Sequence, residues 1–166
     1  MKAERDFLVR ALINAGIRGK IHESIKSLKN SNEVHLAAIL RVNESFVRSG
    51  SKKKFTDQEG HRKQRSKLFN RVTTLHVVIG DSDEEKVEKI LTAFLEKISN
   101  GLAVDGNWVG VEIGDADWIE EQDSILKSKI AVEFDVTLTG GIYVDASLLN
   151  VSLGNVNTEV INTGEQ

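Results

Sequence analysis

The stretch IAVEFDVTLT, residues 130–139, decides the fold. Apolar side chains occupy every second position in it, and Glu133, Asp135 and Thr137 lie between them. Side chains alternate between the two faces of a strand, so this pattern predicts a β-strand with one face in a core and one face in water. Gly140 and Gly141 follow directly, and we expect them to end the strand.

Three further segments show strand patterns on the N-terminal side of this stretch. Residues 34–42 carry apolar side chains in both alternating rows, and residues 68–79 are rich in β-branched residues. Residues 102–113 read as a hairpin, because Asp105 and Gly106 supply the positive φ angles of a tight turn. The polar residues 43–67 are expected to form a long loop between two strands of an extended hairpin.

Two segments show the helical period. In residues 82–99 apolar side chains recur at i, i+3, i+4 and i+7, Ser82 and Glu85 match a capping box, and Asn100 and Gly101 follow as a stop. Leu8, Ala11, Leu12 and Ala15 form a shorter N-terminal face that ends at Gly16, whereas residues 17–32 are only weakly helical. We therefore expect an α+β fold, with an antiparallel or mixed β-sheet packed against helix 82–99 and the N-terminal helix.

The length and composition favour one domain without covalent cross-links. The chain has 166 residues, no cysteine and a formal net charge of -3, so disulfides and thiolate metal sites are excluded. No apolar run reaches the length of a membrane span, and we expect a soluble, intracellular protein with no membrane partner. Residues 1–144 are expected to form the domain, and residues 145–166 a polar C-terminal tail or arm.

The familiar motifs for cofactors are missing from the sequence. His22, His35, His61 and His76 share no metal-binding spacing, and neither glycine-rich phosphate-loop pattern occurs. We expect no cofactor, no metal and no catalytic residues.

Basic residues gather in residues 48–67 of the expected loop, against only Asp57 and Glu59. They are Arg48, Lys52, Lys53, Lys54, Arg62, Lys63, Arg65 and Lys67. Such a loop can neutralise phosphates, and Phe55 could stack on a base, so contact with nucleic acid is one hypothesis. A mobile, solvated loop in the free monomer is the other.

An acidic stretch with no basic residue precedes the deciding strand. It consists of Glu112, Asp115, Asp117, Glu120, Glu121 and Asp123. A magnesium-dependent nuclease could pair Asp117 or Asp123 with Glu133, while a solvated charged hairpin needs no metal. A third interpretation places the basic loop of one subunit against the acidic stretch of its neighbour in a homomeric ring.

The order of these elements resembles that of the phage tail terminator, or tail completion, proteins. The resemblance lies in RVTTLHVVI (71–79) running into helix 82–99, then in residues 109–118 and in SKIAVEFDVT (128–137). It covers most of residues 3–143. These proteins are alike in architecture more than in residues, and the long loop and polar C-terminal tail of this chain depart from the smaller members.

The resemblance implies a structural protein of the virion tail, assembled in the host cytoplasm and without enzymatic activity. Its copies would form a homo-hexameric ring that caps the tail tube, stops its polymerisation and joins the head. The implied partners are the chain itself, the tail tube protein and the head-tail connector protein. A small nucleic-acid-binding protein that uses residues 48–67 remains the first alternative, and the magnesium-dependent nuclease the second.

Overall fold

The computed structural model describes residues 2–120 and 130–148, which form three helices and one mixed sheet. The helices are α1 (Lys2–Ala15), α2 (Ile25–Lys29) and α3 (Glu84–Lys97). The strands are β1 (Ile21–His22), β2 (Leu36–Arg48), β3 (Lys52–Thr56), β4 (Arg62–Asp81), β5 (Gly101–Val104), β6 (Asn107–Glu120) and β7 (Ile130–Ser147). The strand order is β1-β2-β4-β7-β6-β5, with β3 also on β4, and only β1 and β2 pair in parallel. The α+β expectation is confirmed.

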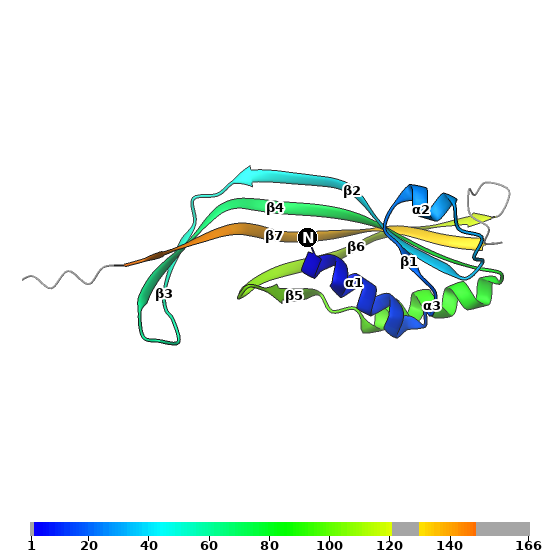
Figure 1. The fold of residues 1–166 in the computed structure, drawn as a ribbon, viewed down its shortest axis with the longest axis horizontal. Helices are drawn as coiled ribbons and strands as arrows, with labels where there is room; N and C mark the ends of the chain where they lie inside the picture. Colours follow the sequence, from blue (N-terminus) through cyan, green and yellow to red (C-terminus); the bar gives the residue numbers. More distant parts are fainter. Residues whose placement is uncertain (1, 121–129, 149–166) are drawn as a thin grey trace, which may run out of the picture.

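Strands β4 and β7 form the long central ladder of the sheet (Figure 1). They pair from Lys63 opposite Ser147 to Asp81 opposite Ile130. The expectation that Gly140 and Gly141 end the strand is wrong, because β7 runs through both to Ser147. These glycines allow close approach instead: a Cβ on Gly140 would lie 3.1 Å from Val109 Cγ2, and one on Gly141 would lie 3.0 Å from the Phe69 carbonyl oxygen.

The expected loop of residues 43–67 is also wrong, because most of it is strand. Strands β2 and β3 pair with β4 on the same side, and the Ser49 N–H donates to the Leu68 carbonyl across the short gap between them. The chain turns only at residues 57–61, where Asp57 Oδ1 accepts hydrogen bonds from the backbone N–H groups of Glu59 and His61. The polar composition therefore belongs to an exposed ribbon, not to a structureless loop.

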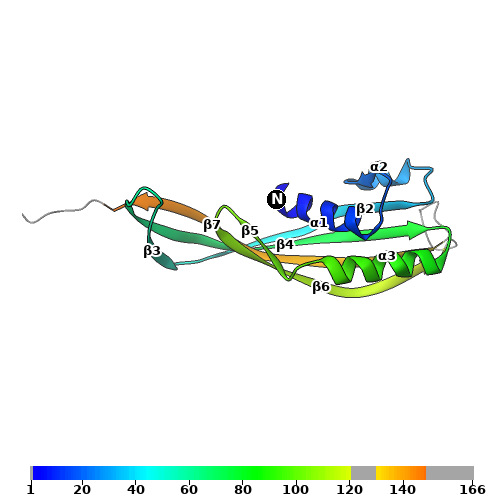
Figure 2. The ribbon, with the colours of Figure 1, turned by 90° about the horizontal axis from the view of Figure 1, so that it is seen from below.

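This ribbon projects beyond the part of the sheet that the helices cover, as Figures 1 and 2 show from two sides. We call it the hairpin arm and define it as β3, the turn of residues 57–61, residues 62–67 of β4 and residues 143–147 of β7. The first residues of the expected C-terminal tail, Asp145–Ser147, thus belong to β7. Residues 149–166 lie outside the described part of the chain.

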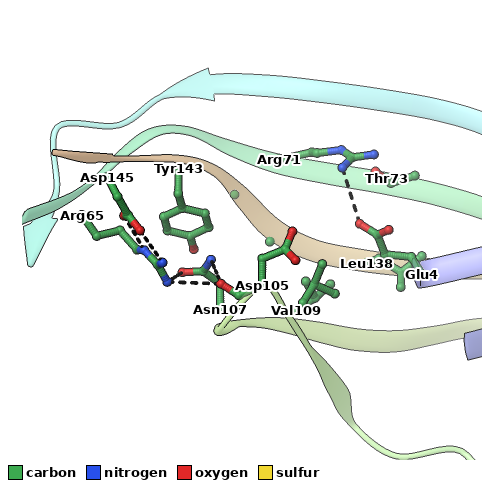
Figure 3. A pocket seen from close by; sticks show the side chains of 13 residues that line it. Glu4, Arg65, Arg71, Thr73, Asp105, Asn107, Val109, Leu138, Tyr143 and Asp145 are labelled. Atoms are coloured by element: carbon green, nitrogen blue, oxygen red, sulfur yellow. Dashed lines mark hydrogen bonds and ion pairs between the residues drawn. The ribbon is translucent and has the colours of Figure 1, made fainter. Parts of the chain in front are cut away.

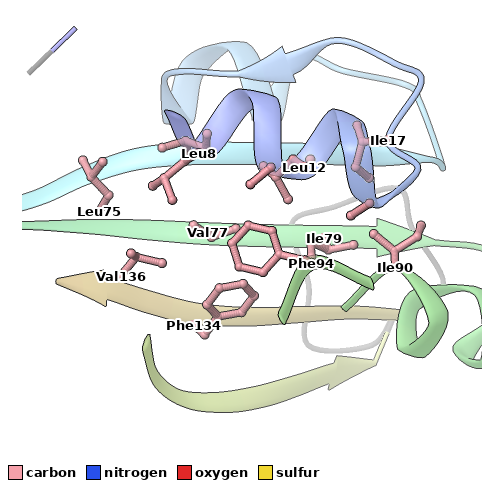
Figure 4. Packing of buried hydrophobic residues seen from close by; sticks show 14 of the residues in the cluster. Leu8, Leu12, Ile17, Leu75, Val77, Ile79, Ile90, Phe94, Phe134 and Val136 are labelled. Atoms are coloured by element: carbon pink, nitrogen blue, oxygen red, sulfur yellow. The ribbon is translucent and has the colours of Figure 1, made fainter. Parts of the chain in front are cut away.

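Helices α1 and α3 cover one face of the sheet and enclose the main core (Figure 4). Leu8 and Leu12 of α1 pack there with Phe94 of α3. The Phe94 ring lies 5.5 Å from the ring of Phe134 on β7, centroid to centroid. The alternating positions of the deciding stretch therefore point into this core, as expected.

A smaller cluster lies on the opposite face, beneath α2. Leu28 of α2 contacts Leu36, Ala38, Val78 and Ala131 there. Residues 17–32, expected to be weakly helical, divide into β1 and the short α2, which Ser24 caps by accepting a hydrogen bond from the Ser27 N–H. The sheet is thus buried on both faces at this end, which explains the two apolar rows at residues 36–39, whereas Val34 and Val42 are exposed.

Helix α3 begins at a different cap from the one that the sequence predicts. Asp83 is the N-cap and accepts from the Glu85 N–H, whereas the hydroxyl and N–H of Ser82 both donate to Asp81. Because α3 begins at Glu84, the cap position falls on Asp83 and Ser82 lies one residue before it. The helix also ends earlier than expected, at Lys97, whereas α1 ends at Gly16 with a φ of 119° as predicted.

We predict that Phe94→Ala lowers the free energy of unfolding by about 3–5 kcal/mol, because it leaves a cavity against Phe134. Leu95→Ala is the matched control in the same helix, since Leu95 is 46% exposed and Phe94 0%, and it should cost below about 1 kcal/mol. Chemical denaturation of both variants measures the difference. Equal losses would contradict this assignment of the core.

Candidate assembly surface

Three of the eight basic residues are held by partners inside the hairpin arm. Lys63 Nζ lies 2.8 Å from Asp57 Oδ2, and the Lys67 ammonium lies 5.7 Å from the centre of the Tyr143 ring. Arg65 forms a two-pronged ion pair with Asp145, at 2.7 Å from Nε and 2.6 Å from Nη2. Carboxylates thus match the charges of Lys63 and Arg65, and Lys67 lies against an aromatic ring.

Arg65 also fastens the hairpin arm to the body of the molecule (Figure 3). Its Nη1 donates to the Asp105 carbonyl at 3.3 Å and to Asn107 Oδ1 at 3.2 Å, and its guanidinium lies over the Phe55 ring. Hydrogen bonds from Arg65 hold the pKa of Asp145 below its usual value. The turn between β5 and β6 is thereby tied to the base of the hairpin arm.

Four other basic residues point outward. Lys52, Lys53, Lys54 and Arg62 are exposed, and no carboxylate of the described residues lies within ion-pair distance of them. We call these four residues the outward cations. Arg48, also exposed, lies with its guanidinium 5.5 Å from the centre of the Phe69 ring. The eight residues of the sequence analysis therefore divide into structural cations and cations that are open to a partner.

The acidic residues of the expected stretch line β6. Glu112, Asp115, Asp117 and Glu120 are all exposed, and Glu121 and Asp123 lie outside the described residues. β5 covers only residues 107–110 of β6, so the rest of its outer edge carries no strand in the described part of the chain. The register shifts between Ile113 and Ala116, which places Asp115 in a bulge. We call Glu112, Asp115, Asp117 and Glu120 the acidic edge.

Two residues of the nuclease hypothesis, Asp117 and Glu133, lie on neighbouring strands, and Glu133 contacts a histidine. Asp117 is directly opposite Glu133, and Glu133 Oε2 lies 3.2 Å from His76 Nε2. His76 Nδ1 in turn lies 2.8 Å from Asp135 Oδ1. Sequence spacing could not reveal this group, because His76 and Asp135 belong to strands 59 residues apart.

Three side chains of metal-binding type converge at one place in residues 2–120 and 130–148, the turn of the hairpin arm. Ligand atoms of Asp57, Glu59 and His61 lie within 4.8 Å of one another. Lys63 already occupies Asp57 Oδ2, and a cation there would have to displace its ammonium. The turn therefore has a structural explanation that needs no metal.

A cavity of about 290 Å³ lies where the hairpin arm joins the body (Figure 3). Arg65, Tyr143 and Asp145 line it on one side, and Glu4 and Arg71 on the other. Arg71 lies 2.6 Å from Glu44 and 3.4 Å from Glu4, so both arginines of the cavity are ion-paired. The cavity thus offers no unpaired arginine to an anion.

We predict that Lys63→Met raises the pKa of Asp57 from about 2 toward 3.8, because Lys63 donates the strongest of its hydrogen bonds. The pKa of Asp57 should still stay somewhat below 3.8, because the backbone N–H groups of His61 and Glu59 continue to donate to its carboxylate. A carboxyl group whose pKa is lowered on folding stabilises the protein at pH values above its unfolded pKa of 3.8. That stabilisation is lost as the pH falls toward the folded pKa of about 2. NMR titration of the Asp57 carboxyl carbon measures this, with Lys54→Met as the control that should leave the pKa unchanged.

No helix among the described residues is long and apolar enough to cross a membrane. No protein-family model matches the sequence, and no protein with a curated description matches it. Among solved structures, the chain is similar to the sheath/tube terminator of an extracellular contractile injection system, PVC, seen by cryo-EM in its extended state. The identity is 13% and the TM-score 0.48, and the match covers 100% of this chain but 64% of that protein's chain. Similarity of this degree does not establish a shared function.

Proposed function

We propose that the chain is a structural subunit of a phage-like tail, whose copies close into a ring on the tail tube. The ring stops growth of the tube and offers a surface to the head connector. Six copies are the number that the sequence resemblance implies. The proposal assigns no enzymatic activity to the chain, and its partners are further copies, the tube protein and the connector protein.

One observation carries the proposal: a single sheet holds charges of opposite sign on its two sides, and neither the outward cations nor the acidic edge has an ion pair with any described residue. The outward cations lie on the hairpin arm, where β3 is on the far side of β4, and the acidic edge lies beyond β7. Strands β4 and β7 separate the two groups, so they cannot meet within one subunit. Contact between the two groups of different copies is heterologous, and such contacts close into rings when the rotation permits.

The order of elements gives further support. The sequence resemblance implies an N-terminal helix, a long hairpin, one amphipathic helix and a closing hairpin, and α1, β2 to β4, α3 and β5 to β7 follow that order. This support is an analogy between folds, and the charged surfaces carry the functional argument. The hairpin arm, which the resemblance does not explain, receives a role in the proposal as the contact to the next subunit.

We predict that reversing three charges, in Lys52→Glu/Lys53→Glu/Lys54→Glu, prevents ring formation, because the acidic edge then meets carboxylates. Lys20→Glu/Lys26→Glu/Lys29→Glu is the matched control, since it reverses three exposed cations outside the hairpin arm. Native mass spectrometry gives the subunit number of each variant. Electron microscopy of tube protein polymerised with each variant should show tubes of limited length only with the wild type and the control.

A charge swap sharpens this test. Glu112→Lys/Asp115→Lys/Asp117→Lys should fail to assemble alone and should recover mixed rings when combined with the triple glutamate variant. Normal rings and normal tube lengths from the triple glutamate variant alone would refute the role of the hairpin arm.

Nucleic-acid binding is a second candidate, favoured by the same outward cations. Against it, the guanidinium of Arg65 lies over Phe55, 5.3 Å from the ring centre, so one face of this ring is already covered and is not open to a base. Phosphate contact by four cations predicts that log K falls with log[salt] at a slope of about -3 to -4 on duplex DNA. Fluorescence anisotropy at 50 and 200 mM salt decides: a slope near this value supports binding, and no binding at 50 mM excludes it.

A further inference from the structure

We propose that the hairpin arm binds the next copy by strand addition, with the outer edge of β3 pairing antiparallel with the outer edge of β6. This inference rests on the proposed function for its partner, a second copy of the chain. It adds that main-chain hydrogen bonds, and not side-chain charges alone, hold neighbouring subunits together.

The outer edge of β6 is available for a strand. Its residues 107–110 pair with β5, and the Val111 N–H donates to the Asn100 carbonyl. From residue 112 to residue 120, the described chain supplies no main-chain partner on the side away from β7. Trp118 stands in this stretch with 43% of its side chain exposed. A long, exposed edge of this kind readily accepts another strand.

The outer edge of β3 is available in the same way. β3 pairs only with β4, and no described strand lies on its other side. Its three consecutive lysines oppose pairing with the same edge of another copy. Two β3 edges repel each other, and so do two β6 edges lined with carboxylates.

The two edges that attract each other are therefore those of β3 and β6. Arg48, Lys52, Lys53 and Lys54 occur in residues 48–56, and the four carboxylates of the acidic edge occur in residues 112–120, a segment of equal length. Pairing two copies of one edge would give a two-fold dimer, whereas pairing unlike edges on opposite sides of the sheet is heterologous and closes into a ring when the rotation permits. The charges thus reject the dimer in favour of the heterologous contact that a ring needs.

The strand directions favour antiparallel pairing. β3 runs antiparallel to β4, and β6 runs in the same direction as β4 because each is antiparallel to β7. A neighbour that is not turned over, and that is displaced both sideways and along the strands by the distance from Arg65 to His76 of β4, therefore brings β3 and β6 together antiparallel. In a ladder that runs past the bulge of β6 without a shift, the register that sets Lys53 opposite Asp115 also sets Arg48 opposite Glu120, and it places Thr56 opposite Glu112 and Ser49 opposite Ile119.

Cysteine cross-linking tests this arrangement, because the chain has no cysteine of its own. Thr56→Cys is mixed with Glu112→Cys, and Ser49→Cys with Ile119→Cys, and each mixture is oxidised after assembly. We expect disulfide-linked dimers in these two mixtures at least tenfold above the exchanged mixtures, Thr56→Cys with Ile119→Cys and Ser49→Cys with Glu112→Cys. Cross-links that favour the exchanged mixtures would overturn the antiparallel arrangement.

Hydrogen exchange on the unmodified chain gives an independent measurement. Amides within residues 112–120 should exchange more slowly in the assembled wild type than in the triple glutamate variant of Lys52, Lys53 and Lys54. Rings that form without this protection and without cross-links would overturn strand addition and leave the proposed function standing. A wild-type chain that remains monomeric at all concentrations tested would refute both.

Discussion

The antiparallel ladder between β4 and β7 is the constraint on which the rest of the structure depends. Its inner half is held in register by burial, since Val77 and Val132 point into the main core while His76 and Asp135 point to the other face. A slip by one residue would carry Glu133 and Asp135 into that core, at a large cost in desolvation. The outer half of the ladder contains few apolar residues, so it receives its register from the buried half.

The register of the outer half determines which side chains pair in the hairpin arm. It places Arg65 opposite Asp145, and the ion pair between them positions the guanidinium so that it also reaches Asp105 and Asn107. Arg65 is half-buried and two-pronged, a geometry in which an ion pair contributes more than a typical surface pair. These contacts tie the base of the hairpin arm to the body of the molecule, and the outward cations lie along the arm.

The sequence predicted the core elements well and the exposed ones poorly. The strand of residues 130–139, the apolar face of α3 and the Asp105-Gly106 turn were all found, because burial imposes a period of two or 3.6 and the turn needs positive φ. Residues 43–67 read as a loop because a ribbon exposed on both faces has no apolar alternation. Gly140 and Gly141 read as a stop, although their real role is close contact with neighbouring strands.

The sequence by itself determined the α+β class, the side of each buried element that faces the core, and the clustering of basic and acidic residues. These are local properties, set by the spacing of side chains along one segment. Only the tertiary structure decided which cations are matched, since Arg65 and Asp145 are 80 residues apart and no spacing rule joins them. It also decided which edges of β3 and β6 have no neighbouring strand among residues 2–120 and 130–148, because an edge is defined by what lies beside it in space.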